Sequence, residues 1–351
     1  MTTHEPGFEL NRPGTLIAAL PAILGFVPEK SLVLVTFEDG GLGSVVRADL
    51  SDELIDRVDE LAQVGSAADP EAAMVMIVDA EGAHCPVCNE EHRRLCEALT
   101  EALAQHGVER CAAQVVDQIV AGGHWHCLDG CGAGGEIDDP MASPLAAAAV
   151  LEGRRLYSRR ADLQAVIALD PQRSAALART VEQAARARET AHRADPAACS
   201  RRDVENAMAA AARVDDGRSL SDAELAEVGC ALTDVQVRDT LYALAVGEGA
   251  DAAESLWAVL ARVLPQPWRV EALVLLAFSA YARGDGPLAG LSLDAALRCD
   301  PNHRMARMLD QALQSGLRPN DIRKLGGTSY RLAEQLGVRL PPRQSFGQRA
   351  G

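Results

Sequence analysis

The sequence predicts a two-part protein, in which a mixed α/β domain is followed by an all-helical domain with a repeat-like helix pair near its end. Short apolar runs such as Leu32–Phe37 and Met74–Val78 occur early in the chain, and such runs are typical of buried strands. After residue 143, apolar residues follow helical spacing. We therefore predict an α/β domain over 10–140, a helical domain over 141–340 and a frayed tail over 341–351.

In the first domain, the expected order is helix, strand, strand, helix, strand, helix, strand, strand. Pro13–Gly25 reads as a helix interrupted at Pro21, and Ser51 has the side chain of a helix N-cap. About five strands should form a mixed sheet with helices on its faces. They are expected at residues 32–37, 44–50, 74–78, 112–120 and 124–128.

In the second domain, Ser143-Pro144 is a typical helix start, with proline in the first turn. Further helices are expected at 158–169, 174–194, 201–214, 221–231, 235–246, 252–264, 268–283, 287–298, 303–315 and 319–336.

The helix pair near the end resembles a tetratricopeptide repeat. Small and apolar residues from Leu273 to Pro301 follow the repeat spacing, and Pro267 precedes Pro301 by one repeat length. Stacks of such repeats bind peptides or partner proteins. The alternative is an ordinary helical bundle.

Charge and apolar content limit the possible functions. The formal net charge is −16, which argues against binding to nucleic acid or to anionic lipid. The sequence has neither a secretion signal nor an apolar run long enough to cross a membrane. We therefore expect a cytoplasmic protein, in which nine cysteines serve as free thiols or metal ligands and not as disulfides.

Two cysteine pairs form the main candidate site. Cys85 and Cys88 make a C-x-x-C motif, and Cys127 and Cys131 make a C-x-x-x-C motif. If the pairs meet in space, four thiolates can hold zinc in a closed tetrahedral site. The alternatives are free, packed cysteines and a redox-active C-x-x-C pair. No other cofactor motif is predicted, since the glycine-rich loop 130–135 precedes an acidic, extended segment and not a helix.

Charged side chains suggest two weaker sites. Glu38, Asp39, Asp79 and Glu81 follow two predicted strands, and they would share one crevice and could hold a divalent cation if those strands ran parallel. The alternative is that they are ordinary solvated acids in turns. A cluster of arginines surrounds Tyr157 and suits an anion, although such clusters commonly balance nearby acids. Its members are Arg154, Arg155, Arg159 and Arg160.

Three stretches resemble an actinobacterial family catalogued as the domain of unknown function DUF4192. They are Leu20–Val35, Ser143–Leu163 and Trp268–Gly286, and the likeness extends from about Pro13 to Gly316. The resemblance implies a cytoplasmic bacterial protein and no catalytic residues. It also implies a cysteine followed a few residues later by Cys-Cys-Pro. Cys127 and Cys131 match the first two cysteines of this pattern, but Gly132 stands where the third is expected and no proline follows.

We therefore predict a non-enzymatic protein-interaction or regulatory protein, with a partner protein bound by the C-terminal helices. The alternative is a zinc-containing or metal-dependent enzyme with its site in the α/β domain. The sequence does not decide whether the chain is an enzyme.

Overall fold

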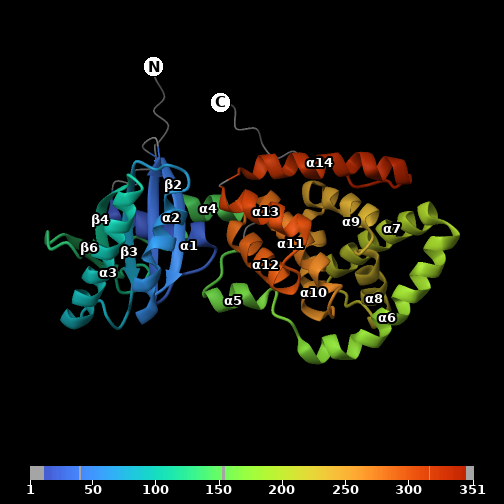
Figure 1. Ribbon diagram of the computed structural model, residues 1–351, viewed down its shortest axis with the longest axis horizontal. Coiled ribbons are helices and arrows are strands. Elements are labelled where there is room, and N and C mark those ends of the chain that lie inside the picture. Colours follow the sequence, from blue (N-terminus) through green and yellow to red (C-terminus); the bar gives the residue numbers. More distant parts are fainter. Residues whose placement is uncertain (1–11, 39–40, 152–154, 316, 345–351) are drawn as a thin grey trace, which may run out of the picture. The chain divides into compact units, whose positions relative to one another are not determined.

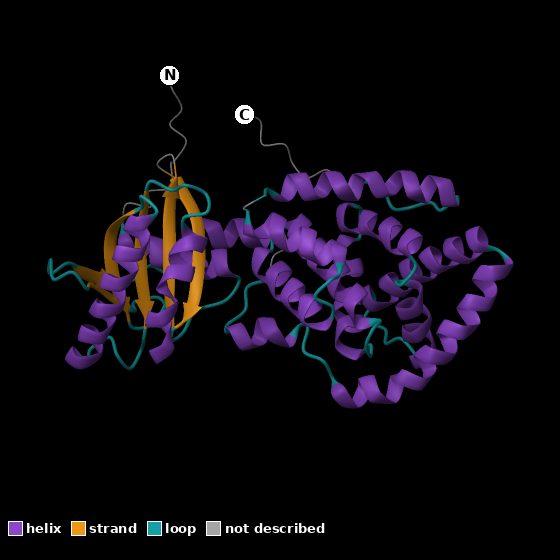
Figure 2. Ribbon diagram, in the orientation of Figure 1, coloured by secondary structure: helices purple, strands orange, loops and turns teal. Residues whose placement is uncertain are grey.

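A computed structural model describes residues 12–38, 41–151, 155–315 and 317–344. Contacts divide the chain into two compact units, Met1–Asp162 and Leu163–Gly351. The first unit contains a mixed six-stranded sheet with helices, and in the described part of the second unit every named element is helical (Figures 1 and 2). The predicted fold class, a mixed α/β sheet followed by a helical region, is therefore confirmed, and the repeat-like helix pair stays a prediction. The helix α4 (Pro144–Leu151) packs against α1 (Pro13–Leu24) within the first unit. The predicted domain boundary at residue 140 stays a prediction.

The sheet has the strand order β2-β1-β3-β4-β5-β6. β1 pairs antiparallel with both β2 and β3, whereas β3 and β4 run parallel and are connected by α3. β5 and β6 continue the sheet in antiparallel pairs. The bounds are β1 Ser31–Glu38, β2 Gly41–Asp49, β3 Ala72–Val78, α3 Pro86–Gln105, β4 Glu109–Val116, β5 His124–Cys127 and β6 Gly134–Glu136.

The sixth strand, β6, goes beyond the predicted set of about five. It has three residues, two of them glycine, so it lacks the β-branched and aromatic residues that signal a strand. Its backbone pairs with β5, from His124↔Glu136 to His126↔Gly134. Tertiary pairing therefore creates a strand where side-chain propensity predicts none.

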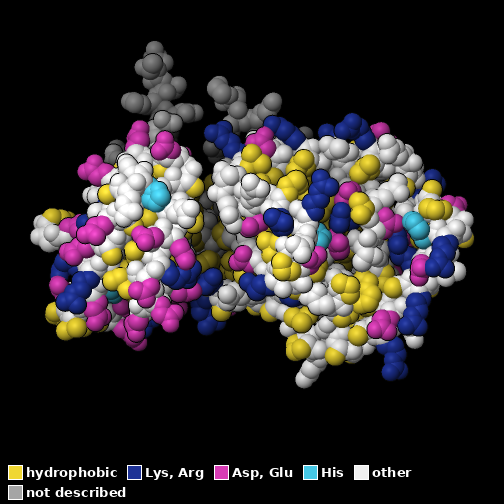
Figure 3. Space-filling model, in the orientation of Figure 1, with side chains coloured by type: hydrophobic (Ala, Val, Ile, Leu, Met, Phe, Trp, Pro, Cys, Tyr) yellow, Lys and Arg dark blue, Asp and Glu magenta, His cyan; other side chains and the backbone are white. Residues whose placement is uncertain are grey.

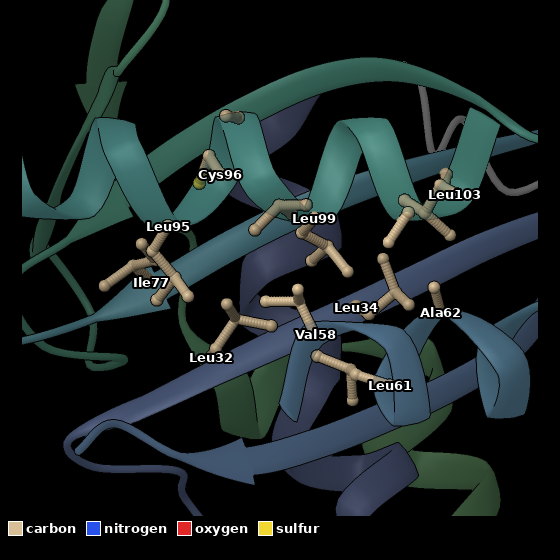
Figure 4. Packing of buried hydrophobic residues seen from close by; sticks show 14 of the residues in the cluster. Leu32, Leu34, Val58, Leu61, Ala62, Ile77, Leu95, Cys96, Leu99 and Leu103 are labelled. Carbon is tan, nitrogen blue, oxygen red and sulfur yellow. The ribbon is translucent and has the colours of Figure 1, made fainter. Parts of the chain in front are cut away.

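One apolar core lies between the sheet and the helices α2 (Val58–Gly65) and α3. Figure 4 shows Leu95, Leu99 and Leu103 of α3 lying toward β1 and β3. The four-residue spacing of these leucines places them on one helix face. This packing fixes α3 on the sheet and so positions the start of the helix beside the end of β3.

The helices of the second unit pack mainly through small and aliphatic side chains. α11 (Arg269–Arg283) is its central helix and is buried along most of its length. It packs against α10 (Ala250–Val263), α12 (Gly286–Cys299) and α14 (Pro319–Leu336). The remaining α-helices are α5 Arg160–Ala165, whose residues fall in both units, and α6 Pro171–Ala194, α7 Pro196–Asp215, α8 Asp222–Ala231, α9 Val235–Leu241 and α13 Arg304–Gln314 of the second unit.

Candidate functional site

The loop between β3 and α3 carries the first cysteine pair. Asp79 begins this loop, and its backbone amide donates to the carbonyl of Val116 at 2.9 Å, at the end of the neighbouring strand. Pro86 occupies the first turn of α3, and Cys85 is the N-cap residue. The Sγ of Cys85 accepts the backbone N–H of Cys88 at 3.4 Å. A thiol therefore replaces the usual hydroxyl or carboxylate at a helix start.

The two thiols of this pair have opposite pKa shifts. The backbone N–H of Cys88 and a hydrogen bond from the Cys88 thiol lower the pKa of Cys85. The pKa of Cys88 is raised, first by its hydrogen bond to Cys85 and then by burial. Donors at a helix N-terminus stabilise a thiolate. The thiol of Cys85 is thus easier to ionise than that of Cys88.

A buried histidine–aspartate pair lies behind the cysteines. His92, in the second turn of α3, has its Nε2 atom 3.4 Å from Oδ2 of Asp79, and their side chains are 7% and 9% exposed. Burial lowers the pKa of His92, although the charge of Asp79 opposes this shift. The Nδ1 atom of His92 is buried and has no hydrogen-bond partner among the described residues. A neutral imidazole with Nε2 protonated toward Asp79 leaves Nδ1 as a proton acceptor.

A cavity of about 550 Å³ adjoins this pair. Cys88, His92 and Asp79 line it together with Lys30 from the other side. The Nζ of Lys30 lies 3.3 Å from Oε2 of Glu81. This hydrogen bond, followed by the charges of Glu81, Asp79 and Cys88, raises the pKa of Lys30. The cavity therefore combines a thiol, an imidazole, a carboxylate and an ammonium group.

Lys30 has an unusual backbone conformation, with φ at 43°. Non-glycine residues seldom occupy the left-handed region, and strain of this kind is commonly found at functional sites. The carbonyl of Lys30 accepts the backbone N–H of Leu50 at 2.9 Å. That bond holds the turn before β1 and keeps the ammonium group beside the cavity.

The structure does not gather the four predicted zinc ligands. Cys127 pairs with Gln114 across β4 and β5, whereas the neighbouring residues of β4, Ala113 and Val115, face the core beneath α3. Because side chains alternate along a strand, Cys127 lies on the sheet face opposite the helix that carries Cys85 and Cys88. Among the described residues, no group of three or more histidines, cysteines, aspartates or glutamates is arranged to hold a metal ion. Zinc binding stays a prediction.

The second predicted pair forms a contact of its own. Burial opposes ionisation of Cys127, but hydrogen bonds from Cys131 and from nearby backbone outweigh it and lower the pKa of Cys127. Cys127 is half-buried and Cys131 is exposed. The two pairs are therefore separate thiol pairs.

The predicted acidic crevice is wrong, because β1 and β3 run antiparallel. Glu38 ends β1 beside the start of β3, since Phe37 pairs with Ala72. Asp79 follows the opposite end of β3, as Ser31 pairs with Val78. Asp39 lies outside the described residues. The condition for a shared crevice, parallel strands, is not met.

The arginines around Tyr157 pair with acids of the first unit. An Nη atom of Arg159 lies 3.3 Å from Asp162, and one of Arg160 lies 2.9 Å from Asp49. Arg154 lies outside the described residues. Charge balancing, the ordinary role of such a cluster, therefore accounts for Arg159 and Arg160.

Sequence reasoning missed two residues of this site, His92 and Lys30. His92 follows Cys88 by four residues within α3, and that spacing places both on one helix face. This signal was available in the sequence. Lys30 carried no signal, because its proximity to Cys88 depends on how β1 pairs with β3.

Fold and site together define a two-unit protein, with an α/β unit that has a thiol-containing cavity and a separate helical unit. The family model for the domain of unknown function DUF4192 matches residues 13–320. The chain belongs to this family, as the resemblance predicted. No curated protein and no solved structure matches it. None of its described helices has the length and apolar character needed to cross a membrane.

Proposed function

We propose that the chain is a non-enzymatic protein-interaction or regulatory protein of the bacterial cytoplasm, whose C-terminal helices bind an acidic segment of a partner protein. The observation that carries this proposal is a basic surface on an acidic chain. Residues 303–344 contain eight arginines and lysines and three aspartates and glutamates, whereas the whole chain has a net charge of −16. A local excess of five positive charges favours an acidic partner.

Five arginines of this segment make up what we term the basic surface. All five are exposed, and within the described residues none has an ion-pair partner. Dark-blue side chains lie along the edge of the second unit where Figure 1 places α14 (Figure 3). Free guanidinium groups recognise carboxylates through paired hydrogen bonds. The five residues are Arg304, Arg307, Arg318, Arg331 and Arg339.

Exposed apolar side chains lie among these arginines. Met308, Leu317 and Leu325 are each between 41% and 45% exposed. Apolar contacts among charges are typical of protein interfaces. A partner segment that combines acidic and apolar residues therefore fits this surface better than a purely acidic polymer.

The repeat-like pair supports a docking role for the outer helices. α11 and α12 form a helix pair that turns at Gly284, with φ at 92°, and α12 is capped by the buried Asp285. α11 is covered by its neighbours, and the hydroxyl of Tyr281 donates to the carbonyl of Leu317 at 2.7 Å. Because α11 is core, a partner is expected on α13 and α14. Deleting residues 268–351 would remove that core, so point variants are the better test.

The test uses a fluorescently labelled peptide of alternating glutamate and leucine, with binding measured by anisotropy. The double charge reversal Arg304→Glu and Arg331→Glu should weaken binding by about tenfold, or about 1.4 kcal/mol. The matched control reverses Arg179 and Arg186, which are exposed on α6 and likewise unpaired among the described residues. Equal weakening by both variants, or none by the first, would reject this surface.

A single-stranded oligonucleotide of the same charge serves as the second ligand. We expect it to bind more weakly than the peptide, because stacking of bases needs free aromatic faces. The one aromatic residue among the described residues of this segment is Tyr330, and the guanidinium of Arg343 lies over its ring at 4.7 Å. Stronger binding of the oligonucleotide would instead favour a nucleic-acid partner.

A further inference from the structure

The first cysteine pair has a geometry suited to reversible oxidation. Cys85 and Cys88 lie one helical turn apart at the start of α3, and the Sγ of Cys85 accepts the N–H of Cys88 at 3.4 Å. Both thiols are half-buried and free. One thiol thus lies at the helix N-terminus with the other beside it, which is the arrangement used by C-x-x-C dithiols.

His92 is a second, independent observation at the same place. It follows Cys88 by one helical turn, is 6% exposed and lines the same cavity. Its Nε2 atom faces Asp79, while its buried Nδ1 atom has no partner among the described residues. An unsatisfied buried nitrogen costs stability. A proton acceptor one helical turn from Cys88, in the wall of the same cavity, provides a functional reason for that cost.

Cys88, but not Cys85, lines a cavity that gives room for a small substrate. Its volume is about 550 Å³, and its wall carries charges of both signs, from Lys30, Arg94, Asp52, Asp79 and Glu91. Pockets that bind small molecules have volumes of this order. A disulfide of a low-molecular-weight thiol that carries both ammonium and carboxylate groups fits the size and the mixed charge.

We infer that Cys85 and Cys88 form a dithiol that exchanges with low-molecular-weight disulfides. The Cys85 thiolate attacks one sulfur of the substrate, so that a bond forms between Cys85 and that sulfur while the substrate S–S bond breaks. The other half of the substrate leaves as a thiolate and takes up a proton. His92 then accepts the proton of Cys88, and the Cys88 thiolate attacks Sγ of Cys85. The second half leaves and takes the proton from His92. Two electrons pass from the dithiol to the substrate, and a Cys85–Cys88 disulfide remains.

Glutathione disulfide is a suitable probe. The reduced full-length chain is mixed with it at neutral pH, with a chelator present, and the products are quenched with acid and mapped by mass spectrometry. We expect the Cys85–Cys88 disulfide to be the main product. Cys88→Ser should accumulate glutathione on Cys85, because the resolving thiol is absent. Cys85→Ser should slow glutathione capture by this pair at least about tenfold.

The variant His92→Gln distinguishes a chemical role of His92 from a structural one. This variant should capture glutathione on Cys85 at the normal rate but resolve the mixed disulfide at least about tenfold more slowly. Cys111→Ser removes an exposed thiol of β4 and should behave as the unmodified chain. The inference fails if no Cys85–Cys88 disulfide forms. It also fails if Cys111 and Cys131 capture glutathione as fast as Cys85 does, or if His92→Gln resolves at the normal rate.

Discussion

The imidazole of His92 is held against the carboxylate of Asp79, with 3.4 Å between Nε2 and Oδ2. Asp79 directly follows β3, and His92 belongs to α3. The pair therefore connects the end of a strand to the helix that follows it, inside a β-α-β unit. Both residues are buried, so their contact contributes to the position of the α3 start and, with it, of Cys85 and Cys88.

The pair should make stability depend on pH. Burial lowers the pKa of His92 from its usual value of 6.5, so the unfolded chain takes up a proton at a higher pH than the folded chain does. Stability from the neutral imidazole is complete above about pH 6.5 and is lost as pH falls toward the folded pKa. His92→Gln should lose less stability than the unmodified chain between about pH 7.5 and 5.5.

Urea denaturation at both pH values measures this difference. His106 is exposed, so His106→Gln is the matched control, and it should follow the pH curve of the unmodified chain. Parallel pH curves for the unmodified chain and His92→Gln would contradict the assignment.

The tight loop at Gly82 gives a second prediction. A Cβ atom at Gly82 would lie 2.1 Å from Oδ2 of Asp79 and 3.1 Å from Cε1 of His92. Gly82→Ala should therefore displace the pair and destabilise the chain by about 1–3 kcal/mol. At Gly290 in α12, a Cβ atom would meet Leu313 at an ordinary 3.4 Å. Gly290→Ala should stabilise by about 0.5–1 kcal/mol. If Gly82→Ala and Gly290→Ala had the same midpoint of thermal unfolding, the predicted difference between the two sites would be refuted.

Local signals in the sequence were enough to locate most elements. Ser221 and Glu224 form a capping box at the start of α8, and Pro144 stands at the start of α4. These rules act within a few residues, so they hold without knowledge of the fold. The helices expected after residue 143 each overlap a helix of the structure.

Site geometry depended on strand direction and register, which local signals do not specify. The acidic crevice required β1 and β3 to run parallel, but they run antiparallel. The four-cysteine site depended on the face that Cys127 occupies, which its pairing with Gln114 sets. A shift of one residue would reverse that face. Lys30 lies near Cys88 because of strand pairing as well, which joins residues far apart in the sequence.

The second unit contains a partly buried charge network that should dominate its electrostatic stability. Arg188 of α6 donates to Asp203 at 2.7 Å and to Asp234 at 2.6 Å. Burial opposes ionisation of Asp234, but its bond from Arg188 and backbone N–H groups of Gln236 and Val237 outweigh burial and lower its pKa. Arg188→Met would remove the closest ion-pair partner of both carboxylates and should cost about 3–5 kcal/mol. Only the more distant Arg202, 3.8 Å from Asp203, and His192, 3.7 Å from Asp234, would remain. Chemical denaturation followed by circular dichroism measures this loss.

Removing the carboxylates as well provides the control. Arg188→Met combined with Asp203→Asn and Asp234→Asn should recover a large part of the stability, because no buried charge then lacks a partner. If the triple variant is no more stable than the single one, packing of the arginine and not its charge is responsible.

Zinc analysis tests the alternative function, a metal-dependent enzyme. Cys127 lies on the opposite face of the sheet from Cys85 and Cys88, so four thiolates cannot surround one ion without a change of register. We expect the purified chain to contain less than about a tenth of an equivalent of zinc, because a closed site needs four ligands. Thiol titration before and after chelation should give the same reactivity. The opposite outcome is one equivalent of zinc whose removal exposes four thiols. If that zinc is also lost in both Cys127→Ser and Cys88→Ser, the two cysteine pairs meet at one ion. A metal site would then replace the dithiol assignment.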